Sequence, residues 1–486
     1  MTCGSQAVKT PSRLDESRFW RCISPSGVLL HQRKRLVMRR ASAVLERFQH
    51  PAQVIVTGFG AAVLLGTALL ALPLATTSGQ SAGWLAALFT ATSAVCVTGL
   101  VVVDTETHWS VFGEVVIAAL VQIGGLGIMT LATLFTVLVS GRVGLRVRIF
   151  AQAETKTVRM VDIRHVVRKV VLFSLACEAV VAVLLTARFA FGYGEPFGRA
   201  VYLGVFHAVS SFNNAGFALW SDNLMGFVSD PWICLTIAVA VIVGGLGFPV
   251  MFELVRSWRH PGKWSVLTRL TVGITAILLV GGTLVFLATE WHNPRTLGAL
   301  DDPGKVLAAF FTAVMPRTAG FNSLDIAAMY PSSWLATDLL MFIGGGSAGT
   351  AGGIKVTTFG LLAFVIWAEM RGEPEVNIGH RRLPETAQRQ AISISLISVA
   401  LVAVSTYVML VLTPHTLDQV LFEVVSAFGT TGLSTGITAQ TGTAGQVLLV
   451  LLMFVGRTGP LTLGSALALK DRTRRYQLPE ERVIVG

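Results

Sequence analysis

Charged residues are scarce in this sequence. Asp, Glu, Lys and Arg make up 13% of the 486 residues, about half of the roughly 25% that soluble domains carry. Hydrophobic residues account for 53%, and the mean hydropathy is +0.66. Apolar runs of about 20 residues recur from Gln53 to Leu469 and leave no stretch for a separate globular core. The composition excludes a soluble protein and predicts a polytopic membrane protein that has the lipid bilayer as its partner.

Cysteine is also rare. The five cysteines lack the spacing of a metal site or a disulfide framework, and we interpret them as small apolar fillers. The basic first 50 residues contain no short apolar core followed by a cleavage site, so we expect no removable signal peptide. The apolar runs contain no pairs of His or carboxyl groups at helical spacing, which argues against an enzyme. His207 stands alone at the predicted start of a short helix, where we expect it to cap or pack.

The net charge of +11 would suit a nucleic-acid-binding protein, but its distribution indicates membrane topology instead. Acidic residues are concentrated in the segments between the basic ones, and a negative outer face would concentrate cations. The positive-inside rule assigns the basic segments, both termini included, to the cytoplasm, and we expect no nucleic acid partner. Of the 38 Lys and Arg residues, 31 lie in five segments, 1–50, 141–170, 256–270, 371–390 and 470–486.

Eight apolar runs are long enough to cross the roughly 30 Å core of a bilayer. They lie at 52–74, 112–140, 168–192, 232–255, 266–289, 335–368, 391–413 and 445–469. Between the members of successive pairs are four stretches too short to cross, near 84–98, 200–215, 304–318 and 416–431, and each ends in polar, Gly-containing sequence. Irregular backbone at membrane depth occurs only where it is buried in protein or lines a water-filled path, so these stretches predict re-entrant loops.

Four glycines, Gly99, Gly216, Gly320 and Gly432, mark an internal repeat. Their separations are 117, 104 and 112 residues, and a second Gly cluster follows them after 25, 28, 24 and 24 residues. We therefore predict an all-α polytopic membrane protein of four tandem helix, pore-loop and helix repeats, with eight transmembrane spans, around a pseudo-fourfold pore. The predicted parts are a basic cytoplasmic extension (1–50), the repeats (51–140, 165–256, 265–370 and 390–470) and a cytoplasmic tail (471–486).

Four converging loops of this kind can carry a dehydrated monovalent cation. Backbone carbonyls replace the hydration shell without the trap of a full negative charge, and glycine allows close approach and positive φ. We predict that the lining carbonyls come from each glycine and the two residues before it, and we call these triplets the filter loops. They are Val97, Thr98 and Gly99; Asn214, Ala215 and Gly216; Thr318, Ala319 and Gly320; and Thr430, Thr431 and Gly432.

The third repeat departs from the others, because the stretch from Phe342 to Lys355 contains six glycines where one continuous helix is expected. Each interior Gly costs about 1 kcal/mol relative to Ala, so we predict a break that serves as a movable gate. We expect Arg457, at the equivalent depth of the fourth repeat, to hydrogen-bond carbonyls freed by the break, with a purely structural tether as the alternative. We expect Arg317 to brace the third filter loop. The candidate gate residues are Gly344, Gly345, Gly346, Ser347, Gly349, Thr350, Gly352, Gly353, Lys355 and Arg457.

Over about residues 50–470 the sequence resembles the Trk/Ktr/HKT superfamily of K⁺ transporters, and within it the KtrB-type membrane subunit. The motifs that carry the resemblance are Thr92-Ser-Ala-Val-Cys-Val-Thr-Gly-Leu100, Ser211-Phe-Asn-Asn-Ala-Gly-Phe217, Pro316-Arg-Thr-Ala-Gly-Phe321, the stretch from Gly344 to Lys355, and Gly456-Arg-Thr-Gly-Pro-Leu461. Glycine in all four filter loops resembles the K⁺-preferring members. Met315 departs from the pattern, and the N-terminal extension has no counterpart.

The resemblance implies K⁺ uptake across the cell membrane, often stimulated by Na⁺, with the broken helix as gate and Arg457 as its partner. It also implies a homodimer with a pore in each chain and a cytoplasmic ring of nucleotide-binding regulatory subunits. No organic cofactor is expected in this chain, and no metal beyond K⁺.

The main alternative is an ion-coupled symporter of a small solute. Such a protein would need broken helices in inverted repeats, whereas the charge pattern places the same ends of every repeat inside. The sequence leaves three questions open: whether Na⁺ is carried or only activates, whether the pore acts as a channel or a symporter, and which nucleotide the partner binds.

Overall fold

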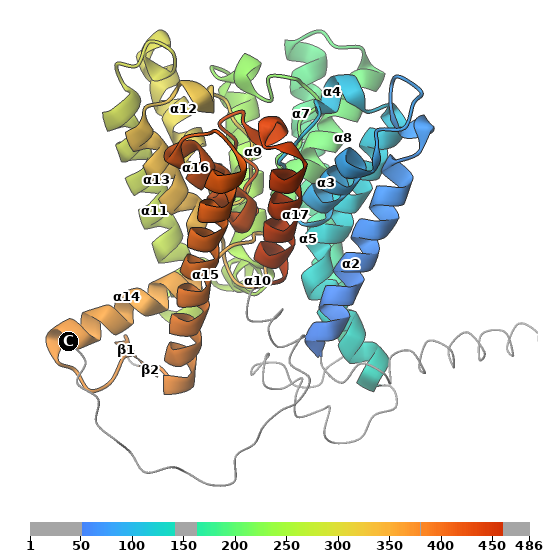
Figure 1. Cartoon of the computed structure of the whole chain (residues 1–486). Helices are drawn as coiled ribbons and strands as arrows, with labels where there is room; N and C mark the ends of the chain where they lie inside the picture. Colours follow the sequence, from blue (N-terminus) through green and yellow to red (C-terminus); the bar gives the residue numbers. More distant parts are fainter. Residues whose placement is uncertain (1–50, 141–162, 380, 460–486) are drawn as a thin grey trace, which may run out of the picture. The chain divides into compact units, whose positions relative to one another are not determined.

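The computed structural model describes residues 51–140, 163–379 and 381–459. This part of the chain is almost wholly helical (Figure 1). Its strands are β1 (Asn377–Ile378) and β2 (Arg381–Arg382), which pair antiparallel. The predicted N-terminal extension (1–50), the tail (471–486) and the end of the fourth repeat (460–470) lie outside the described residues.

Each predicted apolar run overlaps a helix or a pair of helices. Six runs overlap α2 (Pro51–Leu70), α5 (Val111–Ser140), α7 (Ile163–Gly192), α11 (Val266–Glu290), α15 (Glu385–Leu412) and α17 (Gly442–Thr458). The other two overlap α9 (Pro231–Leu246) with α10 (Phe248–Ser257), and α13 (Pro331–Phe342) with α14 (Val356–Arg371). In the described part of the chain, α7, α11 and α15 are each long and apolar enough to cross a membrane, and α9 with α10 qualifies as a bent pair.

The second repeat contains a bend that the sequence analysis did not predict. The apolar run 232–255, which we expect to cross the membrane, is divided into α9 and α10, and these meet at Gly247 with an angle of 105° between them. Gly247 has φ 93°, which favours glycine, and Pro249 in the first turn of α10 suits the start of a new helix. A Cβ on Gly247 would lie 2.3 Å from the carbonyl oxygen of Ser347. The bend therefore adjoins the Gly-rich stretch of the third repeat.

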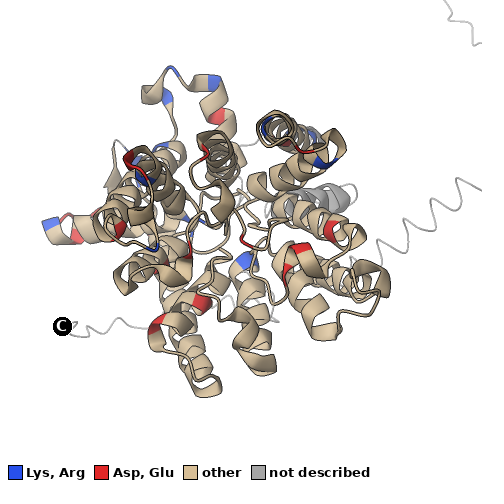
Figure 2. Cartoon of the chain, turned by 90° about the horizontal axis from the view of Figure 1, so that it is seen from above, with Lys and Arg blue, Asp and Glu red and all other residues tan. Residues whose placement is uncertain are grey.

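The four short stretches also form helices, α3 (Trp84–Val95), α8 (Phe197–Phe212), α12 (Asp302–Val314) and α16 (Leu417–Gly429). We call each predicted repeat, with its short helix, a unit. The last three short helices each pack against a later helix of the preceding unit: α8 against α5, α12 against α9, and α16 against α13. The helix α3 packs against α17, which closes the circle. Figure 2 shows the helices arranged around a centre where loops converge.

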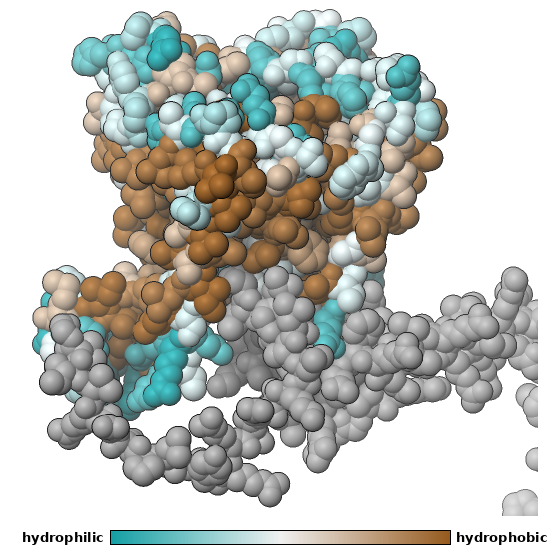
Figure 3. Space-filling model, in the orientation of Figure 1, coloured by the Kyte–Doolittle hydropathy of each residue, from teal (hydrophilic) through white to brown (hydrophobic). Residues whose placement is uncertain are grey.

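Hydrophobic side chains form a broad band around the middle of the visible face, between more hydrophilic zones above and below (Figure 3). Large apolar side chains are highly exposed, including Leu64 (69%), Ile277 (70%) and Val411 (70%). A continuous apolar surface of this kind marks a membrane or a protein interface. Its position as a band across this face fits the bilayer that the composition predicts.

The buried carboxyl group of Glu290 holds the connections at one end of the third unit. Glu290 ends α11 and is 0% exposed. Its Oε1 accepts hydrogen bonds from Ser333 Oγ (2.5 Å) and Tyr330 N (2.9 Å). Its Oε2 accepts from Asn293 Nδ2 (2.6 Å) and Thr296 Oγ1 (2.7 Å). One side chain thus accepts from four donors, two in the connection after α11 and two at the start of α13.

We expect Glu290→Ala to lower the free energy of unfolding by about 3 kcal/mol, because it leaves buried donors without an acceptor. The melting temperature of the purified protein in detergent measures this change. Asp302→Ala is the control, since the Asp302 side chain is 77% exposed and pairs only with Lys305 at 3.2 Å among the described residues. Equal melting temperatures for the two variants would contradict the role given to Glu290.

Candidate ion pathway

The four predicted filter loops share one uncommon backbone conformation. Gly99, Gly216, Gly320 and Gly432 have φ of 89°, 71°, 71° and 95°. Two positions earlier, Val97, Asn214, Thr318 and Thr430 have φ of 55°, 60°, 69° and 50°. These are four of the six non-glycine residues with positive φ in the described part of the chain. Such conformations cost about 1–3 kcal/mol each and persist where the surroundings enforce them, so their recurrence indicates a built site.

The filter loops form a closed ring in chain order. A Cβ on Gly99 would lie 2.4 Å from the carbonyl oxygen of Ala215 on the second loop. The equivalent distances are 2.6 Å from Gly216 to Ala319 O, 2.4 Å from Gly320 to Thr431 O, and 2.0 Å from Gly432 to Thr98 O. A side chain at any of the four glycines would strike the backbone of its neighbour. All twelve predicted filter residues therefore lie in loops that meet at one place.

Three serines on the short helices form hydrogen bonds with these loops, and the sequence analysis did not predict them. Ser93, Ser210 and Ser426 each stand six residues before a filter glycine. Ser93 Oγ accepts from Gly99 N (3.0 Å), Ser426 Oγ accepts from Gly432 N (3.1 Å), and Ser210 Oγ donates to Phe217 O (2.8 Å). Their constant offset from the glycines was the signal that could have revealed them.

The third loop is held differently, because Val314 occupies the serine position. Ala319 N and Gly320 N both donate to Met315 O, at 3.0 and 3.4 Å. Pro316 has no N–H to offer. The residue at which the sequence departs from the family pattern thus supplies the carbonyl that secures this loop.

The loops contain side-chain oxygens that the protein leaves without partners. In the described residues, the hydroxyls of Thr98, Thr318 and Thr430 are buried and make no hydrogen bond. Buried polar atoms are nearly always paired. Three exceptions in one ring, next to converging carbonyls, fit a site that coordinates a cation or its water.

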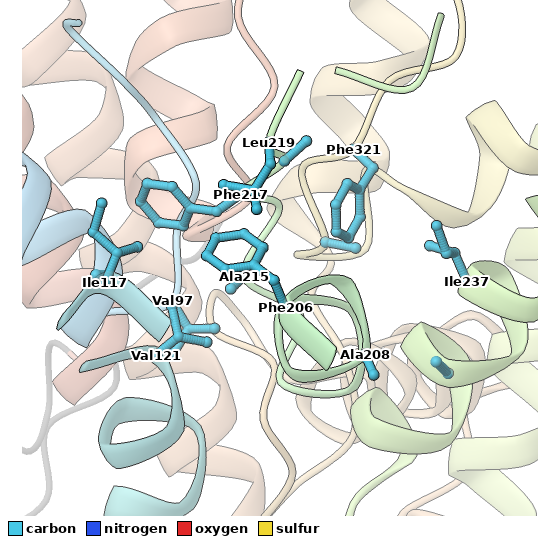
Figure 4. Close-up of a cluster of buried hydrophobic side chains, with 14 of the residues drawn as sticks. Val97, Ile117, Val121, Phe206, Ala208, Ala215, Phe217, Leu219, Ile237 and Phe321 are labelled. Atoms are coloured by element: carbon cyan, nitrogen blue, oxygen red, sulfur yellow. The ribbon is translucent and has the colours of Figure 1, made fainter. Parts of the chain in front are cut away.

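The residue after each glycine anchors its loop in the core. Leu100, Phe217, Phe321 and Leu433 are all at most 2% exposed. Figure 4 shows Phe217 and Phe321 in a buried cluster with Val97, Ile117 and Phe206. The rigid apolar surroundings keep the strained backbone in place.

In the first, second and fourth units, the second set of glycines lies on the later helix. The lack of a side chain there lets this helix pack closely against the short helix. A Cβ on Gly124, Gly244 or Gly456 would lie 2.0, 2.0 or 1.9 Å from the carbonyl oxygen of Val95, Phe212 or Phe428, respectively. In the third unit, Gly344 instead faces Gly352 O of its own segment, at 2.1 Å from the Cβ position. The regular packing is therefore interrupted only there.

The predicted break lies between α13 and α14, where residues 344–355, the Gly-rich segment, form an irregular loop. Its ends meet: Gly344 N donates to Ile354 O (2.8 Å) and Val356 N donates to Gly345 O (3.0 Å). Gly346 N donates to Gly245 O (2.7 Å) beside the α9–α10 bend. The segment therefore forms a closed loop that rests against the second unit.

The Gly-rich segment also touches two filter loops. Thr350 Oγ1 donates to Asn214 Oδ1 (3.1 Å) of the second loop. A Cβ on Gly352 would lie 1.9 Å from Thr430 Oγ1 of the fourth loop. Within the segment, Lys355 Nζ donates to Ala351 O (2.5 Å), and Ser347 Oγ bonds Thr357 Oγ1 of α14 (2.8 Å). The predicted gate residues Gly349 and Gly353 lie in the same loop, against Gly247 and Gly429.

Two buried arginines lie close to the loops. Arg457 is 2% exposed; its Nη1 donates to Thr350 O and its Nη2 to Gly124 O (2.7 Å), so it bridges the Gly-rich segment to α5. Thr350 O is a freed carbonyl of the kind expected for Arg457, whereas Gly124 O belongs to the helix α5. Arg317 is 7% exposed, and its Nη2 donates to Thr275 Oγ1 of α11 (3.1 Å).

His207 packs rather than caps, and the prediction of its position at the start of a helix is wrong. It lies in the interior of α8, stacked on Trp220 with ring centroids 4.3 Å apart. Its Nδ1 bonds Leu203 O (2.8 Å), and its Nε2 accepts from Leu219 N (3.3 Å). His207 thus fastens the chain that follows the second filter loop.

Residues 16–472 match the family model of TrkH, described as a cation transport protein. The chain belongs to the TrkH family. It is 40% identical over 436 residues to the Ktr system potassium uptake protein B of Bacillus subtilis, covering 90% of this chain and 97% of that protein. It is 34% identical over 442 residues to the potassium/sodium uptake protein NtpJ of Enterococcus hirae, with the same two coverages.

The TrkH family relationship extends to the fold. The crystal structure of the potassium transporter TrkH from Vibrio parahaemolyticus superimposes with a TM-score of 0.66 at 19% identity, over 85% of each chain. The chain is therefore an all-α membrane protein of a cation transport family, which confirms the resemblance and the expectation that it is not an enzyme.

Proposed function

We propose that this chain takes up K⁺ across the plasma membrane through a filter built from its four filter loops. The observation that carries the proposal is the closed ring in which each filter glycine abuts the backbone of the next loop. Rings of carbonyls that replace a hydration shell are how cation filters select. Named relatives that transport potassium support K⁺ as the substrate.

We propose further that the four units are repeats around a pseudo-fourfold axis, with eight spans and both termini in the cytoplasm. The contacts of α3, α8, α12 and α16 with the preceding unit support this arrangement, and so does the placement of basic residues. On this proposal, residues 335–368 form one span that is broken at the Gly-rich segment.

The Gly-rich segment is the gate of the proposed pathway. Arg457 holds this segment in place by its hydrogen bonds, and we call it the latch. The segment lies against the second and fourth filter loops, and Arg457 joins it to α5 on the other side. Half of the residues of this segment are glycine, whose backbone can adopt conformations that other residues disfavour, so the segment can change conformation if these hydrogen bonds are exchanged for others.

Na⁺ and partner proteins complete the proposal. The name of the Enterococcus relative includes sodium, which supports an action of Na⁺ on this chain, as substrate or as activator. The relatives are named as parts of a Ktr system, which supports work with further subunits. We propose that these are cytoplasmic nucleotide-binding regulatory subunits and that this chain is a homodimer.

We expect Ser93→Ala to lower the ratio of K⁺ to Na⁺ uptake about fivefold, because it removes one hydrogen bond worth about 1 kcal/mol from the first filter loop. Thr90→Val is the matched control, since Thr90 lies one turn earlier on α3 and its buried hydroxyl has no partner in the described part of the chain. Radiotracer uptake into liposomes measures both. A wild-type ratio in the Ser93→Ala variant would show that Ser93 does not support the filter.

A further inference from the structure

Glu178 is an acidic residue in the middle of a membrane helix that has no part in the pathway described so far. It lies about 20 Å from either end of α7 at 1.5 Å per residue, and it is 6% exposed. Among the described residues it takes part in no ion pair. Ionisable groups at this depth are rare and serve a function by default.

The partners of Glu178 are two amide side chains from different elements. Gln122 of α5 donates from Nε2 to Glu178 Oε1 at 2.9 Å. Asn213, at the end of α8, donates from Nδ2 to the same oxygen at 3.2 Å. Asn213 Nδ2 also donates to Gln122 Oε1 at 2.8 Å and to Val209 O of its own helix at 2.9 Å, so the three side chains form a closed triangle that is held to α8. One oxygen of Glu178 is the point on which both donors converge.

Asn213 immediately precedes the second filter loop. The neighbouring Asn214 has φ 60°, and its amide carries two contacts within the pathway. Its Oδ1 accepts from Thr350 Oγ1 of the Gly-rich segment (3.1 Å), and its Nδ2 donates to Arg317 O beside the third filter loop (3.5 Å). Asn213, which contacts Glu178, is therefore followed in the chain by Asn214, which contacts the Gly-rich segment and the backbone beside the third filter loop.

The side chain of Asn213 packs directly against α5. A Cβ on Gly125 would lie 1.9 Å from Asn213 Oδ1, so α5 is in direct contact with it. Gln122 lies close to Gly124, whose carbonyl oxygen accepts from Arg457 Nη2 at 2.7 Å. The same short stretch of α5 thus contacts both the Glu178 triangle and the proposed latch.

We propose that Glu178 is a positioning residue that sets the K⁺ selectivity of the second filter loop through Asn213. It does not touch the ion. Its Oε1 fixes the amide of Asn213, which fixes the strained backbone at Asn214 and the carbonyls that follow. This role rests on the proposed function of the filter loops.

The test compares the ratio of K⁺ to Na⁺ uptake among variants of the full chain, purified and placed in liposomes. Glu178→Leu removes the acceptor with an apolar side chain of similar size. We expect it to lower the ratio about fivefold, the effect of one lost hydrogen bond. Glu178→Gln keeps an oxygen acceptor, so we expect this variant to have the wild-type ratio.

Ser174→Ala is the matched control. Ser174 lies one turn before Glu178 on α7, is 0% exposed and has no hydrogen-bond partner in the described part of the chain, so its replacement should leave the ratio unchanged. Asn213→Ser provides an independent route if Glu178→Leu does not fold. It leaves Glu178 in place, removes the amide, and should show the same loss, with no further loss when the two are combined.

The outcomes separate this role from the proposed function. A wild-type protein that carries K⁺ and Na⁺ equally would overturn the filter itself. A selective wild type with an unchanged ratio in Glu178→Leu or Asn213→Ser would overturn only the role of Glu178. Equal losses in Glu178→Leu and Glu178→Gln would also overturn it, because the effect would then belong to the charge and not to the acceptor oxygen.

Discussion

Replacing Gly99 by serine is expected to reduce the ratio of K⁺ to Na⁺ uptake at least about tenfold, the factor that corresponds to 1.4 kcal/mol of strain at one site. Gly99 has φ 89°, and its Cβ position lies 2.4 Å from Ala215 O and 3.2 Å from Gly216 Cα. The serine side chain must therefore push two filter loops apart. A wider ring loses the close fit of its oxygens around a dehydrated ion and discriminates less.

The measurement is competitive uptake of K⁺ and Na⁺ by the purified variant. Gly60→Ser is the control, because no atom lies within 4 Å of the Cβ position of Gly60 on α2. We expect that variant to keep the wild-type ratio. An unchanged ratio in the Gly99→Ser variant would show that the first loop is not part of the filter.

Deleting residues 346–353 is expected to raise K⁺ flux about tenfold, because it removes the segment that we propose as the gate. The chain can tolerate the deletion, since the ends that remain already lie side by side. Gly344 N bonds Ile354 O at 2.8 Å, and Val356 N bonds Gly345 O at 3.0 Å. The magnitude is that of about 1.4 kcal/mol removed from a barrier.

Flux into liposomes under a K⁺ gradient checks this expectation, with size-exclusion chromatography to establish that the variant folds. Removing residues from the connection between β1 and β2 of the hairpin is the control for deletion as such, and it should leave flux unchanged. A folded gate-deletion variant with wild-type or lower flux would contradict a gate at this position.

The periodic features of the site were predictable from the sequence because they recur. Gly99, Gly216, Gly320 and Gly432 could be aligned with one another, and the alignment indicated where strained backbone and close approach would be needed. The same alignment contained Ser93, Ser210 and Ser426 at a constant offset. These serines lie on the short helices α3, α8 and α16 and not beside the glycines, so the repeat of the loops alone does not indicate their hydrogen bonds.

Features that occur once were harder to predict. The bend at Gly247 interrupts a run whose hydropathy is continuous, and its signal is only the local pattern Gly247-Phe-Pro249. The contacts of Glu178 with Gln122 and Asn213 join residues 56 and 35 positions apart, and no periodicity connects them. Such contacts depend on how α5, α7 and α8 pack, which a single sequence does not state.

The contacts of Arg457 fall between these cases. A basic residue inside a span next to a Gly-rich break suggested that it would bond freed carbonyls, and Thr350 O is such a carbonyl. Its second acceptor, Gly124 O of α5, was not predicted. The predicted pseudo-fourfold arrangement makes the first and fourth units neighbours, but it does not state which carbonyl of α5 lies within reach of Arg457.

Uptake of K⁺ and Na⁺ by the purified full-length chain in liposomes, at equal external concentrations of the two ions, tests the central claim most directly. The closed ring of filter loops predicts K⁺ uptake well above Na⁺ uptake, with the difference reduced in the Gly99→Ser protein and kept in the Gly60→Ser protein. Absence of flux for either ion would contradict the claim and return a solute symporter to consideration. Equal flux for the two ions in the wild type would contradict the filter.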